Sequence, residues 1–139
     1  MIQDEPQRHG VTEGAVYYDR EVTEKIIACA IEVHRQLGPG LLESAYEECL
    51  CHELNLQGIN FERQRLLPLE YKGIKLDCGY RMDIVVNGRV VIELKCVEKL
   101  TSVHEAQLLT YLRLSEIRTG LIINFYTGIL KNGIKRLVL

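Results

Sequence analysis

Asp83, Glu93 and Lys95 lie at the edges of two apolar runs of the sequence, and they are the residues best suited to chemistry. Asp83 precedes a run of β-branched residues, and Glu93 and Lys95 flank Leu94 in the next such run. Burying an unpaired carboxylate is costly, so each acid must reach solvent, pair with a cation or bind a metal. Two carboxylates beside a lysine would form a site for a hard cation with a cationic partner next to it.

The turn between the two runs decides whether Asp83 and Glu93 share one face of a sheet. An Asn-Gly dipeptide at positions 87 and 88 is typical of tight hairpin turns and predicts two antiparallel strands. A two-residue loop would pair Val86 with Arg89. Because side chains alternate with period two, that register would turn Asp83 away from Glu93.

A three-residue loop gives the opposite outcome. With a loop over residues 86–88 and the glycine in the left-handed conformation, Val85 would pair with Arg89. Asp83 would then lie on the same face as Glu93. We predict this register, because only this arrangement assembles the charged site.

The elements that must position these residues follow from the spacing of apolar residues. Helices are expected over 22–37, 42–56 and 103–115, the last opened by a capping box at Ser102-x-x-Glu105. Strands are expected over 61–72, 76–85, 89–97, 120–126 and 134–139. The order ααβββαββ predicts an α/β fold. Its mixed sheet has an antiparallel meander and a parallel crossover strand, and it is flanked by helices on both faces.

Two of these helices carry polar residues that could join the strand charges. Glu43 lies in the first turn of the second helix, where the helix dipole alone would also favour a carboxylate. Gln107 and Tyr111 lie one turn apart on the third helix. Apolar spacing assigns to the core Leu42, Ala45, Cys49 and Leu56 of the second helix and Val103, Ala106, Leu109 and Leu112 of the third.

The chain of 139 residues is long enough for one domain with a buried core. Residues 1–20 are polar and lack apolar periodicity, so we expect a loose N-terminal tail followed by a single domain over 21–139. No apolar run approaches the roughly 18 residues of a membrane span. The N-terminal residues also lack the pattern of a signal peptide, so we expect a cytoplasmic protein without membrane association.

Net charge is −2, which does not by itself indicate a nucleic-acid partner. The distribution says more, because residues 78–139 hold nine Lys and Arg against five acids, and two of those acids are Asp83 and Glu93. A phosphate-binding face and a solvated mixed surface both fit this distribution.

The five cysteines are scattered through apolar segments, which suits reduced thiols that behave as small hydrophobic residues. A zinc site is disfavoured, because Cys49-x-Cys51-His52 lies in a predicted helix and no second close cysteine pair completes a tetrahedral set. A thiol-based redox protein is disfavoured as well, because no Cys-x-x-Cys pair is present.

Asp83, then nine intervening residues, then Glu93-Leu94-Lys95 resembles the defining motif of the PD-(D/E)XK nuclease superfamily, whose fold is restriction-endonuclease-like. Met82 stands where the name of that motif has proline. The run Gly40-Leu-Leu-Glu43-Ser-Ala-Tyr46 resembles the signature of the GxxExxY family within that superfamily. Gln107-x-x-x-Tyr111 is similar to the helix motif of RecB-like nucleases, and the segments 120–125 and 132–136 also resemble the GxxExxY pattern.

The resemblance implies a Mg²⁺-dependent (or Mn²⁺-dependent) nuclease that hydrolyses phosphodiester bonds of DNA, or less readily of RNA. It implies that Asp83, Glu93 and the backbone carbonyl of Leu94 hold the cation, and that Lys95 orients the attacking water or neutralises the phosphate. Glu43 would reach the cation through water or help to hold a second one.

The resemblance also implies that Gln107 and Tyr111 position the lysine or a phosphate. Since the surface is only weakly basic, we expect a second copy of the chain to help grip a duplex, as a homodimer.

Each residue also has a structural interpretation. Glu93 and Lys95 could form a solvent-side ion pair, Asp83 could cap the turn, and Gln107 and Tyr111 could be ordinary helix surface. The alternative function is a non-catalytic module that keeps the nuclease fold for binding or assembly. The enzyme is the interpretation favoured by convergence of four helix and strand elements on one site.

Overall fold

The computed structural model describes residues 13–139, with side chains from residue 19 onward, as a mixed α/β fold. The helices are α1 (Glu13–Leu37), α2 (Glu43–Leu56) and α3 (Ser102–Ser115). A five-stranded sheet has the order β1-β4-β5-β6-β7, with β1 Phe61–Leu66, β4 Arg81–Val86, β5 Val90–Lys95, β6 Thr119–Asn124 and β7 Ile134–Val138. The strands β2 (Leu69–Tyr71) and β3 (Ile74–Leu76) form a separate hairpin, and a 3₁₀ helix (Leu130–Gly133) precedes β7.

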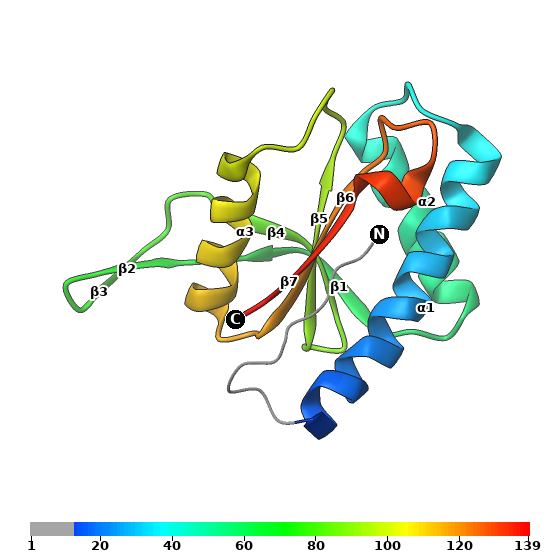
Figure 1. The fold of residues 1–139 in the computed structure, drawn as a ribbon. Coiled ribbons are helices and arrows are strands. Elements are labelled where there is room, and N and C mark those ends of the chain that lie inside the picture. The colour runs from blue at the N-terminus through cyan, green and yellow to red at the C-terminus, as the bar shows by residue number, and fades with distance from the viewer. Residues whose placement is uncertain (1–12) are drawn as a thin grey trace.

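The sheet is covered on both faces, as Figure 1 shows. Helices α1 and α2 lie together on one side and bury a large apolar cluster against β4, β5 and β6. Helix α3 lies on the other side and buries a smaller cluster through Leu108, Tyr111 and Leu112. No helix within residues 13–139 is long and apolar enough to cross a membrane.

The predicted crossover is confirmed. Strand β6 runs parallel to β5 and follows α3, and all of its residues are buried, as expected for an apolar strand between two helical layers. Gly120 permits the close approach of α3, because a Cβ at this position would lie 2.9 Å from a methyl carbon of Leu108. Strand β7 then pairs antiparallel with β6, which also matches the prediction.

The β4–β5 hairpin has the predicted three-residue loop but a different register. Val86 pairs with Val90, so the loop is 87–89 rather than 86–88. Asn87 and Gly88 both have positive φ values of 54° and 65°, which Asn and Gly tolerate best, and this fixes the tight turn on them. The predicted pairing of Val85 with Arg89 was therefore wrong, but the parity was right.

The long strands expected over 61–72 and 76–85 are each divided. The ladder between β1 and β4 ends near Pro68, which has no backbone N–H to donate, and a turn at Lys72-Gly73 forms the β2–β3 hairpin. This hairpin projects from the body of the molecule (Figure 1), and the side chains of Tyr71 and Ile74 on it are 60% and 61% exposed.

Helix α1 begins earlier than expected, so residues 13–20, which the sequence assigned to a loose tail, form its first turns. Asp19 is buried there and accepts hydrogen bonds from the Thr119 hydroxyl at 2.6 Å and from Arg89 Nε at 3.1 Å. The start of α1 is therefore anchored by polar contacts with β6 and with the β4–β5 loop. The prediction relied on apolar spacing, which does not register such contacts. The rest of the expected tail, residues 1–12, lies outside the described residues.

The predicted core faces of the two helices are only partly right, because Leu112 is fully buried on α3 as expected but other predicted core residues are exposed. On α2 the fully buried side chains are Tyr46, Leu50 and Leu54, whereas Leu42 is 74% exposed. On α3, Val103 is 73% exposed. Both helices carry apolar residues on more than one stripe, so the face that packs is chosen by the sheet and not by spacing alone.

The cap of α3 also lies one residue earlier than predicted. The Thr101 backbone N–H donates to His104 Nδ1 at 3.0 Å, which is the reciprocal bond expected from Ser102 and Glu105. Glu105 instead forms an ion pair of 2.9 Å with Lys135 on β7.

Tyr46 fixes the loop that leads into α2. Its ring is fully buried and stacks on Phe125 at 4.3 Å, and its hydroxyl donates to the Gly38 carbonyl while accepting the Leu41 N–H at 3.1 Å. The short Gly-rich loop is therefore tied to the core just before Glu43.

We expect Tyr46→Phe to lower the free energy of unfolding by about 1–2 kcal/mol, because the loop loses both partners of the hydroxyl. Tyr126→Phe is the matched control, since its hydroxyl donates to the Leu41 carbonyl from an exposed position. We expect it to cost under about 0.5 kcal/mol. Urea unfolding measures both, and equal losses would show that the Tyr46 hydroxyl has no special role.

Candidate functional site

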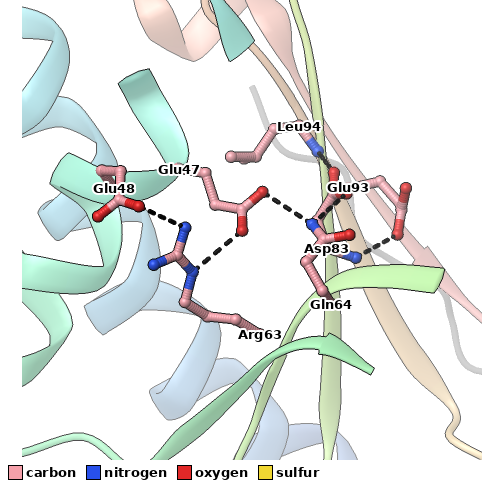
Figure 2. A network of polar contacts seen from close by, with 7 residues as sticks. All are labelled: Glu47, Glu48, Arg63, Gln64, Asp83, Glu93 and Leu94. Atoms are coloured by element: carbon pink, nitrogen blue, oxygen red, sulfur yellow. Dashed lines mark hydrogen bonds and ion pairs between the residues drawn. The ribbon is translucent and has the colours of Figure 1, made fainter. Parts of the chain in front are cut away.

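Asp83 and Glu93 lie where the ladder between β4 and β5 ends. Beyond the Ile84–Ile92 pair, backbone donors bind side-chain carboxylates. The Asp83 N–H donates to Glu93 Oε2 at 3.1 Å, and the Leu94 N–H donates to Asp83 Oδ2 at 2.8 Å. Each acid is thus tied to the backbone of the neighbouring strand, as Figure 2 shows, and the two carboxylates are held beside each other.

Both carboxylates have pKa values above the ordinary range. The pKa of Glu93 is raised to about 8, first by burial and then by the negative charge of Asp83, and this net value already includes the lowering effects of the Asp83 N–H and Lys95. Burial is also the main cause that raises the pKa of Asp83, and the negative charges of Glu47 and Glu43 add to it. The site therefore concentrates more negative charge than the protein itself neutralises.

Lys95 belongs to the same face and is held by α3. Its Nζ donates to Gln107 Oε1 at 3.1 Å, and Gln107 Nε2 donates to the Tyr111 hydroxyl at 3.2 Å. The Tyr111 ring packs edge-on against Tyr80 at a centroid distance of 6.3 Å. Burial and the charge of Glu93 raise the pKa of Tyr111, so its hydroxyl keeps its proton near neutral pH.

Glu43 lies at the start of α2 and is exposed. No hydrogen bond or ion pair found in the part of the chain that the structure describes joins it to Asp83 or Glu93. Its charge nevertheless raises the pKa of both, with a smaller effect than burial. The other residues predicted from sequence form two hydrogen-bonded groups. One group is Asp83, Glu93 and Leu94, and the other is Lys95, Gln107 and Tyr111.

The carboxylates of the site suit a divalent cation that keeps part of its water shell. Within residues 13–139, no three His, Cys, Asp or Glu side chains cluster in a way that would enclose an ion. Mg²⁺ does not require such a cage, because it usually keeps several waters and binds one or two carboxylates. A buried carboxylate, Glu93, beside a half-buried one, Asp83, both with raised pKa values, fits that pattern of ligation.

A second layer of polar residues, which the sequence did not predict, lies behind Asp83. Glu47 of α2 is 8% exposed and accepts hydrogen bonds from Arg63 Nε and Gln64 Nε2, both at 3.0 Å (Figure 2). Gln64 Nε2 also donates to Asp83 Oδ1 at 3.3 Å. The spacing of Glu47 one turn after Glu43 was a usable signal, whereas nothing in the sequence marked Gln64.

A family model described as PD-(D/E)XK nuclease superfamily matches residues 20–137, which include every residue of the site. No curated protein and no solved structure matches the chain significantly.

Proposed function

The chain belongs to the PD-(D/E)XK nuclease superfamily, and on that premise we propose that it is a Mg²⁺-dependent or Mn²⁺-dependent nuclease that cleaves DNA in preference to RNA. Its restriction-endonuclease-like fold, a mixed five-stranded sheet between helices, provides the frame. The single observation that supports catalysis most strongly is the pairing of Asp83 and Glu93 through backbone donors, on the face that carries Lys95.

Asp83, Glu93 and the Leu94 carbonyl are the proposed ligands of the metal, which when bound would supply an activated water and neutralise charge on the phosphate. The carboxylates of Asp83 and Glu93 repel each other, and a cation would relieve that repulsion. Glu43, at the start of α2, is proposed to act at longer range through water, since no direct bond joins it to the pair.

Lys95 is proposed to orient the water or to stabilise the charge that develops on the phosphate. Gln107 Oε1 accepts one hydrogen bond from the ammonium group and so restricts where its other two N–H groups point. Tyr111 accepts a hydrogen bond from Gln107, and its own proton therefore remains available to a phosphate oxygen. In this proposal Gln107 and Tyr111 of α3 orient the Lys95 ammonium group, while β4 and β5 carry the two carboxylates.

The finer assignments belong to the same proposal. We place the chain in the GxxExxY family because Tyr46 of that motif fixes the loop before Glu43.

The free cysteines among the described residues support a reducing compartment, hence the cytoplasm, which imaging of a tagged chain would test. The exposed Tyr71 and Ile74 of the β2–β3 hairpin support a homodimer, because an unsupported hairpin is only marginally stable; sedimentation as a monomer would contradict it.

The test of function is cleavage of single-stranded DNA, duplex DNA and RNA with Mg²⁺, with Mn²⁺ and with EDTA, beside the Lys95→Ala variant. We expect cleavage that needs the metal, is faster on DNA and is lost in the variant. Absence of cleavage, or equal cleavage by the variant, would leave the non-catalytic binding or assembly module as the function.

A further inference from the structure

Gln64 interrupts the pairing of the edge strand β1 with β4 directly opposite Asp83. Arg63 pairs with Ile84 and Arg65 pairs with Met82, but the pair between them is missing. The φ angle of Gln64 is 50°, in the left-handed region that residues other than glycine rarely adopt. Such a conformation costs free energy and persists only where surrounding contacts hold it, and these sites are often functional.

The contacts of the Gln64 side chain supply that support. Its amide nitrogen donates to Glu47 Oε1 at 3.0 Å and to Asp83 Oδ1 at 3.3 Å. Both partners are carboxylate oxygens, which only accept, so the amide nitrogen and not its oxygen must face them. One hydrogen serves each acid, and the amide separates two groups of like charge (Figure 2).

Glu47 is itself fixed from the opposite side. Its second oxygen, Oε2, accepts a hydrogen bond from Arg63 Nε at 3.0 Å, and the same guanidinium donates to Glu48 Oε2 at 3.1 Å. Because Glu47 is buried in α2, its orientation follows that of the helix, and the chain of bonds runs from α2 through β1 to β4.

Asp83 therefore has a donor on each oxygen. The Leu94 N–H holds Oδ2 at 2.8 Å, and Gln64 holds Oδ1 at 3.3 Å. Two donors on different elements define the plane of the carboxylate, which a single donor would leave free to rotate. We propose that Gln64, oriented by Glu47, is a positioning residue that sets the orientation of the Asp83 carboxylate for a divalent cation. This inference rests on the proposed function, because that function makes Asp83 a metal ligand.

The test compares wild type with Gln64→Met, which keeps the length of the side chain and removes both donors. Gln57→Met is the matched control, because Gln57 is exposed at the end of α2. Two measurements are made: the Mn²⁺ dissociation constant by calorimetry, and the hydrogen-exchange rate of the Leu94 amide without metal by NMR. We expect Gln64→Met to bind Mn²⁺ about tenfold more weakly and to exchange the Leu94 amide faster, and Gln57→Met to change neither.

Glu47→Gln is a second variant that does not depend on the backbone of β1. A glutamine has one side-chain oxygen where the carboxylate has two, so either Arg63 or Gln64 loses its acceptor. We expect shifts in the same direction as for Gln64→Met, and saturating Mn²⁺ to restore most of the cleavage rate in both.

Wild-type Mn²⁺ affinity together with wild-type Leu94 exchange in Gln64→Met would overturn the positioning role and leave the nuclease proposal standing. Absence of Mn²⁺ binding in wild type would refute the nuclease proposal instead. The Leu94 exchange rate would then decide the positioning role alone, and an unchanged rate would overturn it.

Discussion

Lys95→Ala is expected to reduce the rate of DNA cleavage by about 10²–10⁴-fold, the range typical of a residue that moves a proton or stabilises developing charge. The ammonium group is the cation held in the site by a side-chain bond, to Gln107 at 3.1 Å, so alanine removes both its charge and its orientation. Metal binding should change much less, because Lys95 is a neighbour of the proposed ligands and not one of them.

Lys99→Ala is the control for this prediction. Lys99 lies only four positions along the chain and is exposed, so it carries the same charge without the contact to α3. We expect it to change the rate by less than about threefold, mainly through weaker attraction of the nucleic acid. An equal loss in both variants would mean that Lys95 contributes only to general charge.

Glu93→Gln is expected to abolish metal-dependent cleavage and yet to stabilise the metal-free protein at alkaline pH. Burial raises the pKa of Glu93 from 4.5 to about 8, so the folded state binds this proton more tightly than the unfolded state does. The resulting destabilisation is absent below pH 4.5, grows between pH 4.5 and 8, and is complete above pH 8. Glutamine removes it and can still accept the Asp83 N–H.

The corresponding measurement is urea unfolding in EDTA at pH 5 and at pH 9. We expect the variant to exceed wild type at pH 9 by roughly 1–3 kcal/mol, with a much smaller difference at pH 5. A variant that is less stable than wild type at pH 9 would show that the Glu93 carboxylate stabilises the fold without a metal, and would weaken its assignment as a ligand.

The sequence predicted the order of elements well, because strong signals mark them. The buried strand β6 is an uninterrupted apolar run, and the helix before it requires a parallel crossover. The parity of the β4–β5 hairpin was predictable from the chemistry of Asp83 and Glu93, which need one face. The register was not, because the choice of loop depends on which residues adopt positive φ.

Contacts that join distant elements were beyond prediction from the sequence. Spacing on α2 favoured Leu42, but the sheet selects the face with Tyr46 and Leu50, and that choice turns Glu47 inward. Gln64 reaches Asp83 only because its backbone leaves the regular strand conformation, which no periodicity encodes. For the same reason Glu43 looked like the nearer acid, although only Glu47 is linked to Asp83, through Gln64.

The most direct test of a divalent-metal nuclease site is a calorimetric titration of the metal-free protein with Mn²⁺, comparing wild type, Asp83→Asn and the exposed control Asp77→Asn. We predict that wild type and Asp77→Asn bind Mn²⁺ equally well and that Asp83→Asn binds it at least about tenfold more weakly. No binding by wild type, or the same affinity in Asp83→Asn, would contradict the account.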